Sequence, residues 1–241
     1  AVHAILDMSA TPFLQELVER VHAYQQERNS PVLLVPESDL NDTRLIRSRE
    51  EGGFGHNAQW NDDFHHALHA LLTGERQGYY QDFGQISHLV KSYTNGYIYT
   101  WNYSSYRRRH HGNASGDLPG SRFVVFSQNH DQVGNRLQGD RMSRLAPFEA
   151  LKLGAACLLL SPFLPLLFMG EEYGEEAPFQ YFVSHTDPEL IDAVRKGRKQ
   201  EFAAFDWQGE PPDPQAESTF QSGKLQWDLR DRGHHRQLLD F

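Results

Sequence analysis

The sequence predicts a parallel α/β fold that amounts to about half of a (β/α)8 barrel. Short apolar runs without a polar break, at residues 32–35 and at 123–126 after Arg122, are typical of strands buried on both faces. Helical patterns precede and follow these runs, which is the element order of a βαβ repeat. The elements that we expect in 241 residues are too few for eight strand–helix units, so long loops account for the remaining length.

The composition limits the possible partners. With 39% hydrophobic residues and a net charge of −9, the chain can form a sizeable core but has no long basic block. Nucleic acid is therefore not expected as a partner. Pro162 and Pro165 interrupt the longest apolar stretch, so no membrane span is expected either. The single cysteine, Cys157, predicts an inert buried thiol, and together with the absence of a visible secretory signal it favours the reducing cytoplasm.

In the first third of the chain, proline and apolar spacing predict one helix and one strand. Thr11-Pro12 is a good helix start, with proline at the first helical position. Apolar residues then recur at helical spacing, namely Phe13, Leu14, Leu17, Val18 and Val21. A break at residues 29–31 separates this helix from the strand at 32–35. Next we expect a short helix near Arg44 and a short strand at 58–60.

An amphipathic helix is predicted for residues 64–72. Asp62 or Asp63 provides the N-cap and Gly74 follows the C-terminus. Three histidines, His65, His66 and His69, lie on the polar face of this helix. The spacing of four between His65 and His69 is that of metal ligands, but no third ligand stands out. We therefore expect a solvated or hydrogen-bonded histidine face, with a metal-binding module as the alternative.

The second half of the chain continues the alternation of helices and strands. The basic run at 107–111 precedes several turn-forming residues and predicts an exposed loop. After the strand at 122–126 we expect a helix at 147–160 and a strand at 163–169. A proline-rich loop at 211–214 and a helical pattern at 234–241 complete the chain.

Acidic residues follow three of the predicted strands. Glu37 and Asp39 follow the first, His130 and Asp131 follow the strand at 122–126, and a run of glutamates follows the last. Ligand-binding groups collect beyond the carboxyl ends of parallel strands. Two carboxylates in different environments are the working groups of glycoside hydrolysis. The alternative is that Asn-His-Asp is only a turn.

These motifs resemble those of the α-amylase superfamily, glycoside hydrolase family 13. Val35-Pro36-Glu37-Ser38-Asp39 and Phe126-Ser127-Gln128-Asn129-His130-Asp131 look like the signatures of its fifth and seventh strands. Further matching stretches are residues 60–69, 129–136 and 170–176. Within the family the resemblance is greatest to members that release trehalose from maltooligosyltrehalose. Branching enzymes are similar in layout but differ in the segment that matches residues 60–69.

The resemblance implies a retaining hydrolase that needs no cofactor and no metal. Glu37 would be the general acid/base, and Asp131 would stabilise the oxocarbenium-like transition state. The implied ligand is maltooligosyltrehalose or a related α-glucan. The residues expected to contact sugar are His3, Asp39, Trp60, Asp62, Asp63, His130, Gln132 and Glu172.

The resemblance also implies that residues 1–241 cover strands five to eight of the barrel. In the family the nucleophilic aspartate directly precedes an Ala-Val-His-Ala segment, and this sequence begins with Ala1-Val2-His3-Ala4. We therefore expect the N-terminal half and a C-terminal β-sandwich to be absent, the missing half to be a partner, and the chain alone to be inactive. The remaining alternatives are another amylase-type hydrolase, a glucan branching enzyme, a non-catalytic sugar-binding fragment, and an inverting enzyme that pairs Glu37 with Asp131.

Overall fold

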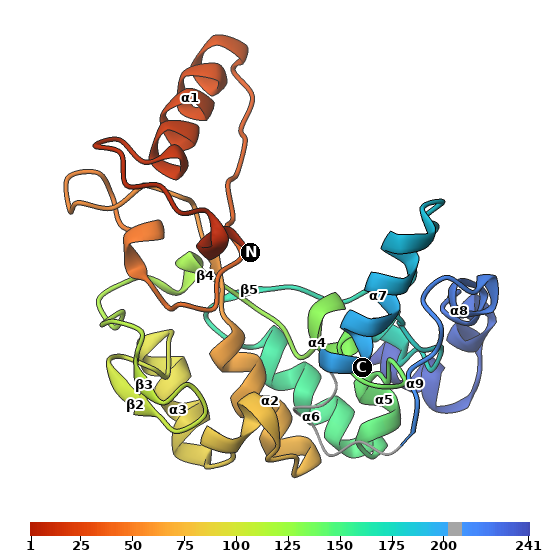
Figure 1. The fold of residues 1–241 in the computed structure, drawn as a ribbon. Coiled ribbons are helices and arrows are strands. Elements are labelled where there is room, and N and C mark those ends of the chain that lie inside the picture. Colours follow the sequence, from red (N-terminus) through yellow and green to blue (C-terminus); the bar gives the residue numbers. More distant parts are fainter. Residues whose placement is uncertain (202–208) are drawn as a thin grey trace. The chain divides into compact units, whose positions relative to one another are not determined.

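A parallel sheet of three short strands lies in one of the two units into which the chain divides (Figure 1). The computed structural model describes residues 1–201 and 209–241. Unit 1 comprises residues 1–67, 82–125 and 160–166, and unit 2 comprises residues 68–81, 126–159 and 167–241.

The sheet of unit 1 has the strand order β1-β4-β5. Its strands are β1 (Gln59–Trp60), β4 (Phe123–Val125) and β5 (Leu164–Pro165). Both pairs are parallel, with Gln59 opposite Phe123 and Val125 opposite Pro165. The predicted parallel arrangement is confirmed for these strands, although β4 and β5 are shorter than expected.

The segment at residues 32–35 is not the buried strand that its apolar run predicts. It is extended, and Asn57 N donates to Leu34 O over 3.0 Å. Leu34 N, however, donates to the side-chain oxygen of Asn57 over 2.8 Å, so a side chain replaces a backbone ladder partner. Exposure alternates along the segment, and Leu33 is 71% exposed. The prediction of burial on both faces is wrong here, because one face remains open.

Aromatic rings fill the interior of unit 1. Phe123 of β4 lies edge-on to Phe163 and to Tyr97, with ring centroids 5.9 Å and 5.1 Å apart. Phe64 packs against Phe163 in the same way at 6.1 Å. Edge-to-face packing of this kind adds to the free energy gained by burying the rings. Gly96 approaches Phe123 so closely that a Cβ would lie 2.4 Å from its ring, and its φ of +76° also favours glycine.

Two helices of unit 1 lie where the sequence predicts them, although Pro12 is the N-cap of the first and not its first helical residue as expected. Helix α1 (Phe13–Arg28) begins directly after Pro12, but only Gln15 and Val18 are buried in it. A 3-10 helix, η2 (Thr43–Leu45), forms near Arg44 as predicted, and α3 (Ile86–Asn95) carries part of the aromatic core. Short 3-10 helices also form at η1 (Val2–Ala4) and η4 (Gly120–Arg122).

Helix α2 (Asp62–Thr73) is capped by a different residue from the one predicted. The side-chain oxygen of Asn61 accepts from Phe64 N over 3.3 Å, which is the N-cap bond. Asp63 is only 4% exposed. Its carboxylate accepts from Ile98 N, Tyr99 N and the Asn41 side chain over 2.7–2.8 Å. The expectation that Asp62 or Asp63 caps the helix is therefore wrong, whereas Gly74, with φ of +80°, follows its end as predicted.

The basic run at 107–111 belongs to an antiparallel hairpin and is not a fully exposed loop. Strands β2 (Asn102–Ser104) and β3 (Arg109–His111) pair with Tyr103 opposite His110. Arg107 is held in a salt bridge of 2.9 Å with Asp39, and His111 is buried. A carboxylate far away in the sequence thus draws part of the basic run inward.

Unit 2 is predominantly helical. Its α-helices are α4 (His130–Gly134), α5 (Met142–Leu145), α6 (Phe148–Leu159), α7 (Pro188–Glu201), α8 (Glu217–Ser222) and α9 (Gly233–Asp240). The 3-10 helices are η5 (Glu171–Tyr173) and η7 (Trp227–Asp231), and η3 (Gly78–Asp82) ends where unit 1 resumes.

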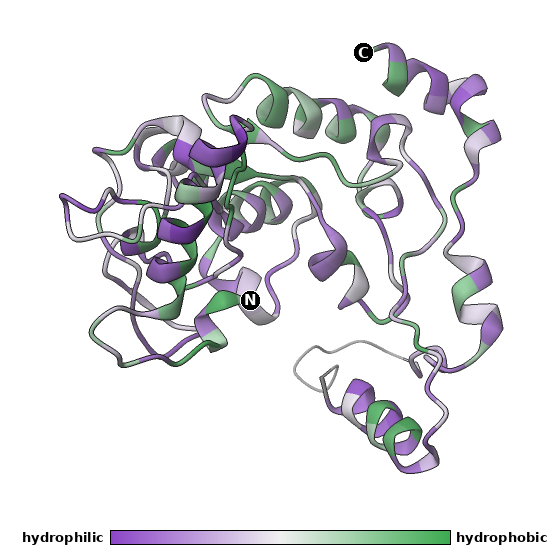
Figure 2. Ribbon diagram, turned by 90° about the horizontal axis from the view of Figure 1, so that it is seen from above, coloured by the Kyte–Doolittle hydropathy of each residue, from purple (hydrophilic) through white to green (hydrophobic). Residues whose placement is uncertain are grey.

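Several elements of unit 2 confirm the sequence patterns. Helices α6 and α9 lie where the periodicity places them, and residues 211–214 form a loop. Cys157 of α6 is half-buried, not fully buried as expected. Figure 2 shows hydrophobic and hydrophilic residues side by side on α7. Within residues 1–201 and 209–241 no helix is long and apolar enough to cross a membrane.

The buried carboxylate of Asp63 predicts a large loss of stability on truncation. Asp63→Ala leaves three buried donors unpaired, and each costs about 1–3 kcal/mol. We expect a loss of about 3 kcal/mol or more in urea unfolding followed by circular dichroism. Asp63→Asn keeps one side-chain oxygen and should lose less. The half-exposed neighbour serves as control: if Asp62→Ala costs as much as Asp63→Ala, the role given to Asp63 is wrong.

Candidate active site

Glu37 lies after the extended segment that runs beside β1 in unit 1. The backbone N–H of Trp60, in β1, donates to Pro36 O over 3.3 Å, and Val2 N donates to Glu37 O over 2.8 Å. The Glu37 side chain is 36% exposed, and its carboxylate lies 3.8 Å from the amino group of Ala1. The backbone of Glu37 is therefore held, while its carboxylate is accessible.

Asp39, two residues later, is held by cationic groups. Its carboxylate accepts from Arg107 over 2.9 Å and lies 3.4 Å from His3. Its backbone oxygen is 2.8 Å from the His111 ring. Burial alone would raise the pKa of Asp39, but the charge and hydrogen bond of Arg107 outweigh it and lower the pKa below its usual value. The structure thus brings His3 and Asp39 together, and it adds Arg107, which belongs to the basic run predicted to be an exposed loop.

The other expected sugar contacts of unit 1 lie near the start of α2. Trp60, in β1, and Asp62 are half-buried. Asp63 turns its carboxylate to backbone amides, and burial raises its pKa against the effect of these donors. This geometry favours a structural role for Asp63.

His130 and Asp131 of unit 2 lie in the first turn of α4. The side-chain oxygen of Asn129 accepts from Asp131 N over 2.8 Å and from Gln132 N over 3.4 Å, so Asn129 is the N-cap. His130 and Asp131 are exposed, whereas Gln132 is buried. One carboxylate oxygen of Asp131 accepts from the Asn135 side chain over 2.7 Å. The Asn-His-Asp sequence therefore forms a helix start that presents two polar side chains to solvent.

A charged network follows α2 in unit 2. His69 donates through Nε2 to Glu75 over 2.6 Å, and its ring stacks on Tyr80 at 4.3 Å. Glu75 binds the guanidinium of Arg136 through two bonds of 2.8 Å and 2.7 Å. Burial lowers the pKa of His69, and although burial alone would raise that of Glu75, its two partners lower it to about 2.

The histidine face of α2 is therefore not solvated. His65, His66 and His69 are all buried, because aromatic rings and the glutamate cover them; His66, for example, packs on Phe83 at 5.1 Å. The hydrogen-bonded alternative is confirmed for His69. In the described parts of the chain, no group of three His, Cys, Asp or Glu side chains could hold a metal ion.

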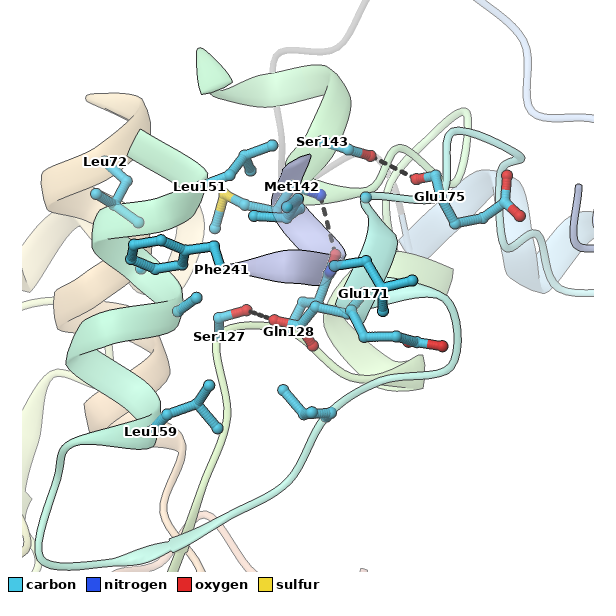
Figure 3. A pocket seen from close by; sticks show the side chains of 17 residues that line it. Leu72, Ser127, Gln128, Met142, Ser143, Leu151, Leu159, Glu171, Glu175 and Phe241 are labelled. Atoms are coloured by element: carbon cyan, nitrogen blue, oxygen red, sulfur yellow. Dashed lines mark hydrogen bonds between the residues drawn. The ribbon is translucent and has the colours of Figure 1, made fainter. Parts of the chain in front are cut away.

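Unit 2 also contains a largely apolar pocket of about 140 Å³ (Figure 3). Ser127 and Gln128 line it just beyond β4, and Leu151, Leu159 and other side chains supply apolar walls. Ser127 donates to the carboxylate of Glu171, which also accepts from Phe168 N over 2.9 Å. Burial raises the pKa of Glu171 to about 7 against these two donors.

Glu172 of this acidic run is an expected sugar contact, and both Glu171 and Glu172 line the pocket. Glu172 is half-buried like Glu171. The sequence pattern does not distinguish the two, because the side-chain partner of Glu171 is Ser127, 44 residues away, which adds to the bond from the nearby Phe168 N.

Comparisons with known proteins extend over nearly the whole chain. No protein-family model matches the sequence. The chain is 50% identical to the malto-oligosyltrehalose trehalohydrolase of Saccharolobus solfataricus over 96% of its length, and 49% identical to that of Arthrobacter ramosus over its full length. The corresponding protein of Mycobacterium tuberculosis is 45% identical, also over the full length. The chain spans about two fifths of these relatives, namely 39%, 42% and 42%.

A solved structure of a proposed α-amylase from Salmonella typhimurium matches the whole chain. The TM-score is 0.89 at 41% identity, and the match covers 41% of that protein. By fold and sequence, the chain falls in the class of α-amylase-type glycoside hydrolases. Within that class it is similar, over 96–100% of its length, to part of the malto-oligosyltrehalose trehalohydrolases of these three organisms.

The raised pKa of Glu171 predicts a pH-dependent stability. Because its folded-state pKa of about 7 exceeds the ordinary value of 4.5, the protonated group stabilises the fold below about pH 4.5, and this contribution is lost as the pH rises through about 7. Relative to Glu171→Gln, the unmodified chain should lose at most about 3 kcal/mol of unfolding free energy between pH 5 and 8.

Urea unfolding at several pH values measures this difference. The exposed Glu176→Gln serves as control and should leave the pH profile of the unmodified chain unchanged. Parallel profiles for the unmodified chain and Glu171→Gln would show that Glu171 titrates normally.

Proposed function

We propose that the chain provides the acid/base and the transition-state-stabilising carboxylate of a retaining α-glucan hydrolase. The proposed reaction is hydrolysis of the α-1,4 bond next to the terminal trehalose unit of maltooligosyltrehalose, which releases trehalose. The observation that carries this proposal is the 45–50% identity to malto-oligosyltrehalose trehalohydrolases of three organisms over 96–100% of the chain.

Glu37 is the proposed general acid/base. A proton donor must reach the leaving oxygen of the substrate, which requires an accessible carboxyl group on a held backbone. Glu37 meets both requirements, whereas the neighbouring Asp39 is engaged by Arg107 and His3. Asp39 and His3 are accordingly proposed to bind substrate hydroxyls together with Arg107.

Asp131 is the proposed stabiliser of the positive charge that develops on the sugar ring. An ionised carboxylate fixed toward this charge acts mainly in the transition state. Asp131 is exposed at the start of α4, and its bond from Asn135 fixes one of its oxygens. His130, exposed beside it, and the buried Gln132 are proposed to hold the sugar at the cleaved position.

The nucleophile of a retaining mechanism is proposed to come from the sequence that corresponds to the remaining three fifths of the relatives' length. Without it no covalent glycosyl intermediate can form. This part of the whole protein is therefore the proposed partner of residues 1–241.

In the whole protein, Glu37→Gln and Asp131→Asn should lower turnover with little change in substrate affinity. Loss of the general acid predicts a fall in kcat of about 10²–10⁴-fold, and loss of the electrostatic stabiliser a fall of about 10²–10³-fold. Trehalose release from maltooligosyltrehalose measures kcat and KM separately. Glu51→Gln, an exposed acid of unit 1, is the control. Near-normal turnover of Glu37→Gln, or an equal loss of affinity and turnover in Asp131→Asn, contradicts the assigned role.

Residues 1–241 alone should release no trehalose, since the nucleophile comes from elsewhere. We expect activity when the chain is mixed with the remaining segment of the Arthrobacter ramosus relative, which is 49% identical over the shared part. The same segment with its nucleophilic aspartate changed to asparagine is the control and should give none. Trehalose release by the chain alone would refute the proposed origin of the nucleophile.

A further inference from the structure

The carboxylate of Asp131 has a hydrogen-bond donor within its own helix. The side-chain Nδ2 of Asn135 lies 2.7 Å from Asp131 Oδ1, one helical turn further on. The backbone N–H of Asn135 also donates to Asp131 O over 2.9 Å. Asn135 therefore fixes both the backbone and one carboxylate oxygen of Asp131.

The amide of Asn135 could in principle point either way. Its two ends are nearly isosteric, but only the NH2 end attracts a carboxylate, while the oxygen end repels it. Arg198 of α7 favours the same orientation from the other end of the amide, because its Nη1 lies 3.1 Å from Asn135 Oδ1. Because a guanidinium donates and cannot accept, it selects the arrangement in which the NH2 group of Asn135 faces Asp131.

Arg198 is itself held in place. Its Nη2 donates to Gly134 O, at the end of α4, over 2.8 Å, and its guanidinium lies 4.9 Å from the ring centre of Tyr181. The planar fork of an arginine suits two acceptors side by side, which a lysine could not bind equally well. Figure 1 shows α7 beside α4 in unit 2, in agreement with these bonds.

The backbone of α4 has supports besides the bond from Arg198 to Gly134 O. At the start of the helix Asn129 provides the cap, and just beyond its end Arg136 is anchored by two bonds to Glu75. Loss of Arg198 therefore leaves these supports of the helix in place, but it removes the hydrogen bond that holds the oxygen of the Asn135 amide.

We infer that Arg198 is a positioning residue for Asp131 and acts through the side chain of Asn135. The inference rests on the proposed role of Asp131 as the stabiliser of the transition state. A carboxylate that is free to rotate stabilises the developing charge less well, although the substrate in its ground state binds as before. Loss of this positioning should therefore lower kcat and leave KM unchanged.

A double-mutant cycle in the whole protein tests this relay, by which we mean the hydrogen bonds from Arg198 to Asn135 and from Asn135 to Asp131. Arg198→Ala and Asn135→Ala should each lower kcat about tenfold, which corresponds to about 1.4 kcal/mol, with KM unchanged within about twofold. Because both changes break the same relay, the double variant should be no slower than the slower single variant. Arg198→Lys retains one donor and should recover part of the loss.

Arg195→Ala is the matched control on the same helix. Arg195 binds Asp213 over 2.8–3.0 Å and is expected to leave kcat unchanged. Multiplicative losses in the double variant, or a normal kcat for Arg198→Ala beside an inactive Asp131→Asn, would overturn the relay and leave the proposed function standing. Near-normal turnover of Asp131→Asn would instead overturn the proposed function. If kcat and the melting temperature fall in parallel across the variants, and Arg198→Lys recovers neither, the positioning role is overturned.

Discussion

The hydrogen bonds of the buried carboxylate of Asp63 are the constraint on which the arrangement of unit 1 depends. A carboxylate with so little exposure needs its hydrogen-bond donors, since an unpaired buried charge is very costly. Two of the donors are consecutive backbone amides, at Ile98 and Tyr99, and the third is the side chain of Asn41. Asn41 O in turn accepts from Asn113 N over 3.1 Å. The start of α2 is thereby tied to the residues before the hairpin and to the loop that follows Glu37 and Asp39.

Acidic residues of two kinds can be distinguished in the chain. Asp39 and Glu75 are each bound by an arginine, and in both cases the arginine lowers the pKa of the carboxyl group against the effect of burial. Glu37 and Asp131 have accessible carboxylates on held backbones, and these are the ones to which chemical roles are assigned. Fixed ion pairs position the loops, while the accessible acids remain available to a ligand. The arginines differ in a similar way. Arg107 and Arg136 each bind a carboxylate, whereas Arg198 binds the side-chain amide of Asn135.

Local patterns in the sequence predicted the elements whose causes are local. The periodicity of α2, α6 and α9 and the glycine after α2 act within a few residues, and these elements lie where predicted; Pro12 marks the start of α1 to within one residue. Predictions failed where a distant partner decides. Asp39 and Arg107 are 68 residues apart, and the amide that interrupts the segment at 32–35 comes from Asn57, 23 residues from Leu34. Asp63 resembled a helix cap in sequence, but its partners lie 35 and 36 residues further on. Of the candidate site, the motifs indicated the acids. The arginine that binds Asp39 and the serine that binds Glu171 are distant in the sequence, so no local pattern could indicate them. The sugar contacts remain predictions.

The N-cap of α4 is an asparagine, Asn129, and not an aspartate, and this limits which substitutions the helix tolerates. Asparagine and aspartate cap helices about equally well, so helix formation alone would allow either at position 129. The amino group of Asn129 is buried and has no hydrogen-bond partner in the described residues, so it gains nothing as a donor there. An aspartate would, however, place a second negative charge two residues from Asp131, and like charges so close together repel each other. The neutral cap therefore leaves Asp131 as the only acidic side chain in the first turn of the helix, and a substitution judged by stability alone would miss this electrostatic requirement.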